Sequence, residues 1–257
     1  MYAKTILKLN QIRSVLDIYK LMTLRQIHYQ LIEFGYKYRN VGTAVKTGRE
    51  QGIINYNEIV DRSRPSYGVD TWLSKKELND YYSKNFKLDY WKDETHKVEI
   101  WSEKDALSQI ILREAEKYRV PVRVTRGFNS ISCLKEWDGD KTVLYFGDHD
   151  PSGLWVDKAI LNTKLQLNLV RMGLTKKECL DWNLPSIPIK ETDADGEGGD
   201  PRSPEYKTEH GDRCWELDSL NPTSLRLLIR GAIEPLINFD LEQKRREEQE
   251  IRDSFKA

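Results

Sequence analysis

The chain has 257 residues, with 41 lysines and arginines against 41 aspartates and glutamates, so its formal net charge is zero. No uncharged apolar run approaches the roughly 18–20 residues of a membrane-spanning helix, and the N-terminus lacks the apolar stretch of a secretory signal. We therefore expect a soluble cytoplasmic protein with no membrane partner. The three cysteines lie 46 and 35 residues apart, a spacing that fits neither a zinc knuckle nor a disulfide framework.

Residues 1–66 have the pattern of a small helical unit. Thr23 and Gln26 form a capping box at the start of its second helix, and Gly35 follows the end of that helix. The third helix ends before Gly52. Helices are expected over residues 11–21, 24–34 and 41–51. Three short helices with a basic third one are typical of a helix-turn-helix or winged-helix DNA-binding module, although residues 53–64 lack an obvious glycine-turned wing.

Basic side chains are concentrated in the first part of the chain. Residues 1–92 contain 16 basic and 9 acidic side chains, leaving 25 basic and 32 acidic ones in the remainder. This asymmetry favours an anion-binding module beside a unit that gathers carboxylates, with a chance distribution as the alternative. The side chains expected to contact DNA in this module are Lys46, Arg49, Arg62 and Arg64.

The pattern changes after a connector over 67–95, for which no regular structure is expected. Residues 96–239 alternate strands with helices, which predicts an α/β fold with a parallel central sheet buried on both faces. The strands are expected over 97–102, 121–124 and 142–146, and the helices between them over 105–117 and 129–137. Further along we expect a helix over 154–173, a mobile loop over 191–213, a helix over 223–238 and a charged helical tail over 240–257.

Acidic residues follow two of the predicted strands. Glu103 comes directly after the first strand, and Asp148 and Asp150 come after the third. Because the carboxyl ends of parallel strands lie at one edge of a sheet, we expect these side chains to converge. Three close carboxylates repel one another unless a cation lies between them, and oxygen ligands of this kind suit Mg²⁺. A helix cap or a solvated loop is the alternative for each residue taken singly.

The run Glu103-Lys104-Asp105-Ala106 and the run Asp148-His149-Asp150-Pro151-Ser152-Gly153 together resemble the TOPRIM domain. The resemblance covers about 98–175 and is closest to the A subunit of topoisomerase VI and its meiotic double-strand-break relatives. It implies a Rossmann-like domain in which Glu103, Asp148 and Asp150 hold Mg²⁺. It also implies that Glu103 acts in proton transfer. Lys104 is a candidate contact to a DNA phosphate, with a solvated lysine as the favoured alternative.

The same family has a winged-helix domain before the TOPRIM domain, with a tyrosine that attacks a DNA phosphodiester. The matching run here is Arg25-Gln26-Ile27-His28-Tyr29, in which glutamine and histidine replace an aspartate and an aromatic residue. On a helical wheel Tyr29 lies away from the apolar face, so we expect an exposed tyrosine whose phenolate Arg25 favours. The alternative is a tyrosine that packs on a neighbour or rests on the surface.

Two acidic residues near the C-terminal part, Glu216 and Asp218, are candidates for the same metal site. Capping of the helix that begins at Asn221-Pro222 is the preferred interpretation of this segment. The four histidines have no i, i+4 pairing, so a zinc site is not expected.

These residues predict a Mg²⁺-dependent enzyme that cleaves DNA strands, either a topoisomerase-like isomerase acting through Tyr29 or a hydrolytic TOPRIM nuclease. A DNA-binding protein without catalysis on the same scaffold is the third hypothesis. A double-strand break made through Tyr29 needs two tyrosines, so a homodimer is expected in that version. The resemblance further implies an ATPase partner subunit and, in a prokaryote, association with the nucleoid.

Overall fold

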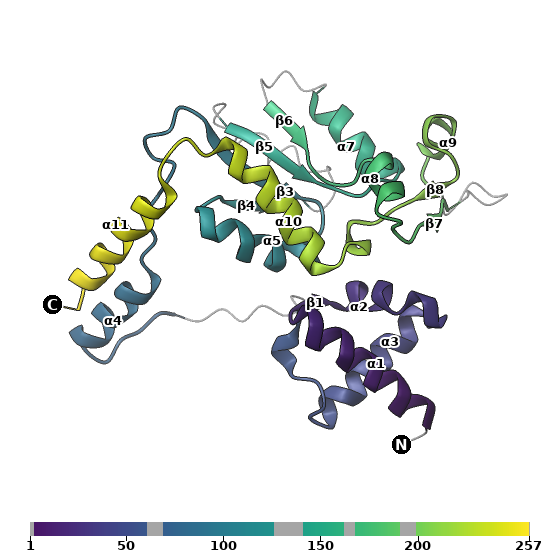
Figure 1. Cartoon of the computed structure of the whole chain (residues 1–257), viewed down its shortest axis with the longest axis horizontal. Coiled ribbons are helices and arrows are strands. Elements are labelled where there is room, and N and C mark those ends of the chain that lie inside the picture. Colours follow the sequence, from purple (N-terminus) through teal and green to yellow (C-terminus); the bar gives the residue numbers. More distant parts are fainter. Residues whose placement is uncertain (1–2, 61–68, 126–140, 162–167, 191–198, 257) are drawn as a thin grey trace.

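The computed structural model describes residues 3–60, 69–125, 141–161, 168–190 and 199–256. Figure 1 shows a helical N-terminal module next to a larger α/β unit, with a pair of helices beside it. The predicted α/β class with a parallel central sheet is confirmed. The described part of the chain contains no helix that is long and apolar enough to cross a bilayer.

Three helices form the N-terminal module: α1 (Ala3–Tyr19), α2 (Leu24–Gln30) and α3 (Tyr38–Glu50). The predicted capping box is present, since the Thr23 side chain accepts from Gln26 N while the Gln26 side chain accepts from Thr23 N. The second helix is shorter than expected, because Leu31 ends it and a 3-10 turn (Ile32–Phe34) leads to the left-handed Gly35. The strands β1 (Met22–Thr23) and β2 (Ile59–Val60) pair in parallel within this module.

The core of this module is a set of apolar side chains from all three helices and both short strands. Its buried members are Leu9, Ile12, Leu16, Met22, Ile27, Leu31, Val41, Ala44, Val45, Ile54 and Ile59. Gly48 on α3 allows the close packing, because a Cβ there would lie 2.8 Å from the Ile54 side chain. The module therefore has a core of its own, distinct from that of the sheet.

The expected connector over 67–95 is partly helical, so that prediction is wrong for α4 (Lys75–Asn85). Ser74 caps α4 by accepting from Glu77 N, a cap signal that a composition-based interpretation overlooks. Helix α4 packs against the C-terminal helix α11 (Leu241–Ser254), and Figure 1 shows the two side by side. Arg252 joins them by donating to the carbonyl oxygen of Phe86.

The sheet has four parallel strands in the order β4-β3-β5-β6. The first three match the prediction, and their bounds are β3 (Lys97–Ser102), β4 (Val122–Val124) and β5 (Lys141–Phe146). The single helix expected over 154–173 is wrong, because the chain forms α7 (Pro151–Leu161) and then the edge strand β6 (Asn168–Arg171). Exposure alternates along β6, which is the period of a strand. The helix expected over 129–137 lies outside the described residues.

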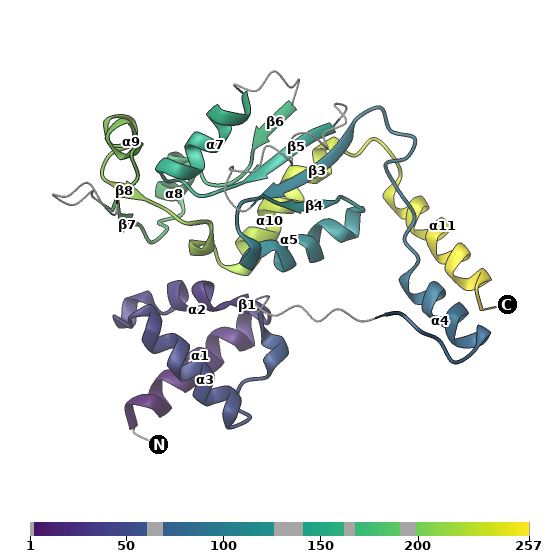
Figure 2. The ribbon, with the colours of Figure 1, turned by 180° about the vertical axis from the view of Figure 1, so that it is seen from behind.

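Helices cover both faces of the sheet. On one face α5 (Ser108–Ala115) and α10 (Pro222–Ile233) pack together over Ile100, Leu144 and Phe146. The view from behind in Figure 2 shows α7 on the opposite side, where Val156 packs with Trp101, Val143 and Tyr145. Burial on both faces explains why the strands β3 and β5 are largely apolar.

The segment expected to be a mobile loop over 191–213 contains regular structure in its described part. Helix α9 (Ser203–His210) has Pro204 in its first turn, and strand β8 (Arg213–Cys214) pairs antiparallel with β7 (Ile187–Pro188). Helix α8 (Lys176–Asp181) is capped by Thr175. Short 3-10 turns occupy Tyr56–Glu58, Asp105–Leu107, Glu116–Tyr118, Leu217–Ser219 and Glu234–Leu236.

Candidate active site

The acidic motifs lie at neighbouring strand ends, as predicted. Ser102 pairs with Phe146, so the residues that follow β3 and β5 are adjacent, and Glu103 N donates to Phe146 O at 3.3 Å. The turn after β5 is tightened by a bond of 2.6 Å from Gly153 N to Asp150 Oδ1. A Cβ at Gly153 would lie 2.3 Å from Asp148 O, so this turn requires glycine.

Glu103 and Asp150 interact as two like-charged carboxyl groups at this edge of the sheet. Burial raises the pKa of Glu103, and the charge of Asp150 raises it further. Burial likewise raises the pKa of Asp150. Both side chains make few hydrogen bonds among the described residues. Glu103 Oε2 accepts only a long bond of 3.4 Å from the Tyr145 hydroxyl, and Asp150 accepts through Oδ1 only, from Gly153 N. A divalent cation would relieve the repulsion within this pair.

Asp148 differs from that pair because protein groups occupy both of its oxygens. Oδ1 accepts from Leu217 N at 2.7 Å, and Oδ2 lies 2.9 Å from Lys104 Nζ. Burial raises the pKa of Asp148 to about 7, against the opposing effect of Lys104. Lys104 is therefore a partner inside the acidic cluster, with a side chain 18% exposed, and the alternative of a solvated lysine is wrong.

The carboxyl oxygens of Glu103 and Asp150 suit Mg²⁺ in their chemistry, because they are hard and largely unengaged. Among the described residues no three His, Cys, Asp or Glu side chains are arranged as a ready metal cluster. The pair therefore fits the predicted metal, while the third predicted ligand is engaged by lysine.

Sequence reasoning missed one residue that shapes this turn. Arg171 on β6 donates to the carbonyl oxygens of Asp148 and Gly153 and lies over the Tyr145 ring. It ties the acidic turn to the edge strand. The signal was hidden because that stretch was predicted to be helical, which placed Arg171 away from the sheet edge.

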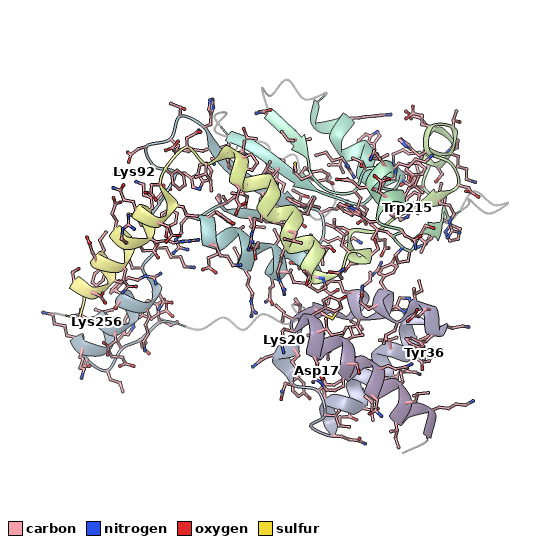
Figure 3. The ribbon with its side chains drawn as sticks, viewed as in Figure 1. Asp17, Lys20, Tyr36, Lys92, Trp215 and Lys256 are labelled. Atoms are coloured by element: carbon pink, nitrogen blue, oxygen red, sulfur yellow. The ribbon has the colours of Figure 1, made fainter. Side chains whose placement is uncertain are left out.

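Helix α2 of the N-terminal module lies against the segment that follows Trp215, which is labelled in Figure 3. Thr23 donates to Asp218 Oδ1 at 3.0 Å, and the buried Gln26 side chain donates to Leu220 O at 3.2 Å. These bonds join residues separated by 195 and 194 positions. Residues of α2 are thereby brought to the acidic edge of the sheet.

Tyr29 is buried, so the expectation of an exposed tyrosine is wrong. Its side chain is 6% exposed, and its hydroxyl donates to Glu216 Oε2 at 3.1 Å. Burial and then the charge of Glu216 raise its pKa, which is opposite to the effect expected from Arg25. The helical wheel failed because it describes one helix, whereas the cover over Tyr29 comes from a segment 187 residues away.

Glu216 contacts side chains from both the N-terminal module and the α/β unit. It accepts from Arg25 and Tyr29, and Lys104 Nζ lies 3.6 Å from its Oε2. Although burial opposes ionisation, Lys104 and Arg25 hold the pKa of Glu216 below its usual range.

The capping role preferred for this acidic segment is wrong. Asn221 caps α10 by accepting from Ser224 N, whereas Asp218 contacts Lys104 and Thr23. These long-range bonds explain why two carboxylates near a helix start do not act as its cap.

The side chains predicted to bind DNA occupy different settings. The Lys46 side chain on α3 is 77% exposed, and its Nζ lies 3.8 Å from Glu50 Oε1. Arg49 donates to the carbonyl oxygens of Tyr56 and Ile59 and stacks on the Tyr56 ring, so it has a structural role in the module. Arg62 and Arg64 lie outside the described residues.

The chain matches no family model, and no curated protein is significantly similar to it. The interpretation of the site therefore depends on its own residues and their geometry.

Proposed function

We propose that the chain is a TOPRIM-type protein, similar to the topoisomerase VI A subunit, that cleaves DNA strands in a Mg²⁺-dependent reaction. One observation carries the proposal, namely that Lys104 links the two motifs. Its Nζ lies 2.9 Å from Asp148 Oδ2 and 3.6 Å from Glu216 Oε2, and the same Glu216 oxygen accepts a hydrogen bond from the Tyr29 hydroxyl. The tyrosine motif and the acidic motif, from separate units, thus share one site. Neither motif alone requires this contact, so their meeting supports a common role.

In this proposal Arg25 and Lys104 bind the scissile phosphate and offset its charge. The Tyr29 oxygen attacks phosphorus as the tyrosine hydroxyl loses its proton, and the bond from phosphorus to a deoxyribose oxygen breaks. That oxygen takes up a proton and leaves as the terminal hydroxyl of the cut strand. Glu103 and Asp150 would hold Mg²⁺, and Asp148 would be available as a third ligand if Lys104 turned to the phosphate. When bound, the metal supplies positive charge near the phosphate.

The N-terminal module serves as the winged-helix-like DNA-binding part. Lys46 is exposed on α3 and suits contact with a phosphate backbone. A double-strand break requires two tyrosines, so a homodimer belongs to this version of the proposal. An ATPase partner subunit is part of the resemblance and has no support of its own from the described residues.

A hydrolytic nuclease is the second candidate, and one observation favours it. Tyr29 is buried and its pKa is raised, which makes it a poor nucleophile as it stands. In this version a water molecule attacks phosphorus in place of Tyr29, while Arg25 and Lys104 keep their phosphate contacts. A DNA-binding protein without catalysis would retain only those contacts.

The test uses supercoiled plasmid, the full chain and Mg²⁺, followed by denaturant and a search for protein covalently attached to DNA. Adducts that disappear in Tyr29→Phe, but persist in the control Tyr56→Phe, support attack by Tyr29. Tyr56 is a suitable control because it lies in the same module and is 67% exposed. Nicking that survives Tyr29→Phe supports hydrolysis, and absence of any cleavage by the wild type refutes both enzyme proposals.

A further inference from the structure

Three donors from two units converge on one carboxylate. Arg25 Nη1 contacts both oxygens of Glu216, the Tyr29 hydroxyl lies 3.1 Å from Oε2, and Lys104 Nζ lies 3.6 Å from the same oxygen. Guanidinium, ammonium and hydroxyl donors arranged around one anion are the groups that also bind a phosphate. The surroundings of Glu216 thus have the composition of a phosphate site.

We propose that Glu216 occupies the phosphate site formed by Arg25, Tyr29 and Lys104, and that a DNA phosphodiester must displace it before the site can act. This inference rests on the proposed function, since it takes DNA as the ligand. It adds an internal competitor: the chain blocks its own phosphate site with a carboxylate. Glu216 is therefore a regulatory residue of the site.

The position of Glu216 suits an occupant that can leave. Its side chain is 16% exposed and that of Arg25 is 44% exposed, so solvent reaches the edge of the site. The backbone beside Glu216 is held, because Leu217 N donates to Asp148. Rotation of the Glu216 side chain would open the site without moving that backbone.

Asp218 provides the contrast within the same segment. It is 2% exposed and bonded to both Lys104 and Thr23, which makes it part of the joint between the units. Glu216 instead contacts Arg25 and Tyr29, the two residues of α2 that the proposed reaction uses. The two carboxylates therefore have separable roles, one in joining the units and one in occupying the site.

A general base is the other role that a carboxylate beside Tyr29 can have. The geometry favours the competitor, because Lys104 and Arg25 hold Glu216 ionised and make it a weak proton acceptor. Burial and Glu216 itself raise the pKa of Tyr29, which makes it a weak proton donor. A strong ion pair at Glu216 therefore opposes proton transfer from Tyr29 in this arrangement.

The experiment measures binding of a fluorescent DNA duplex by anisotropy, in EDTA so that metal-dependent cleavage does not interfere. Glu216→Gln removes the charge and keeps the shape, and Glu209→Gln is the control with the same charge change on α9. If the carboxylate fills the site about 90% of the time, its removal tightens binding roughly tenfold. The control should change affinity less than twofold.

Glu216→Asp separates local occupancy from net charge, because it keeps the charge and shortens the side chain by one methylene. We expect it also to tighten binding, and we expect Arg25→Ala to abolish the gain from Glu216→Gln. Unchanged or weaker binding by both Glu216 variants would overturn the inference. Unchanged binding combined with lost cleavage would identify a general base instead.

The proposed function and this inference can fail separately. Tighter binding by Glu216→Gln without cleavage by any variant would retain the competitor and refute the enzyme. Cleavage by the wild type, with no gain in DNA affinity in either Glu216 variant, would retain the enzyme and refute the competitor.

Discussion

Replacing Lys104 with methionine tests the acidic cluster most directly. Lys104 Nζ lies 2.9 Å from both Asp148 and Asp218, whose side chains are 9% and 2% exposed. Burial opposes the charge on Lys104, but Asp148 and the other carboxylates outweigh it and raise its pKa. Methionine fills a similar volume without a charge, so Lys104→Met leaves two buried carboxylates without their cation.

The expected loss is about 3 kcal/mol in the free energy of unfolding at neutral pH, the low end of the roughly 3–5 kcal/mol for breaking a buried ion pair. The low end applies because Asp148 can take up a proton, its pKa being about 7 in the intact pair. With a urea dependence near 3 kcal/mol per molar, the unfolding midpoint falls by about 1 M. Mg²⁺ should restore part of this loss, because the variant adds Asp148 to the ligands available.

The assay is urea unfolding followed by tryptophan fluorescence, in EDTA and again in millimolar Mg²⁺. Lys158→Met is the matched control, because that lysine pairs with Glu205 at the surface and should leave the midpoint unchanged. A midpoint in Lys104→Met that equals the wild-type value would refute the ion-pair reasoning. Stabilisation by Mg²⁺ no larger than in the wild type would refute the metal site.

Three further predictions concern the same site and its supports. Gly153→Ala should destabilise the fold by about 2 kcal/mol, since its Cβ would lie 2.3 Å from Asp148 O, whereas Gly231→Ala on α10 meets no atom within 4 Å and should be neutral or stabilising, both by thermal melting. Thr23→Val should lower the free energy of unfolding in urea by about 2 kcal/mol, because it removes both a helix cap and the hydrogen bond to Asp218. Thr175→Val removes a helix cap only and should lower it by about 1 kcal/mol. Equal losses in the two variants would contradict a stabilising contact between the N-terminal module and the α/β unit. In EDTA the wild type should gain stability relative to Asp148→Asn as pH falls from about 7 towards about 4, because the folded Asp148, with its pKa raised from 3.8 to about 7, binds more protons than the unfolded one; melts of both proteins across that range measure this difference.

The parts of the fold that follow local rules could be predicted from the sequence. Alternating polarity predicts the strand β3, a largely apolar run predicts β5, and the capping box of Thr23 and Gln26 predicts the start of α2. Adjacent strand ends then follow from the parallel topology, which brought Glu103 near Asp148 and Asp150. Edge strand β6 was missed because it follows α7 closely, so its short alternating pattern was absorbed into an overlong helix.

The parts of the site that depend on long-range contacts could not be predicted. Burial of Tyr29 and the position of Glu216 follow from one contact across 187 residues, for which neither segment carries a local signal. The same contact reverses the electrostatic argument about Tyr29, because a helical wheel includes Arg25 but not Glu216. Rules about one helix therefore identify Tyr29 as the candidate nucleophile, but they predict neither its burial nor its hydrogen bond to Glu216.

Positive and negative side chains are also gathered together at this site. Arg25 and Lys104 face Glu216, Asp148 and Asp218, while Glu103 and Asp150 share the same edge with raised pKa values. Carboxylates outnumber these two cations, so a phosphate would meet net repulsion in the arrangement as it stands. Displacement of Glu216 releases positive charge toward the phosphate, and a cation at Glu103 and Asp150 offsets the remaining negative charge. Affinity for DNA should therefore depend on both events together, with Mg²⁺ and Glu216→Gln each increasing it and the two effects exceeding their separate sum.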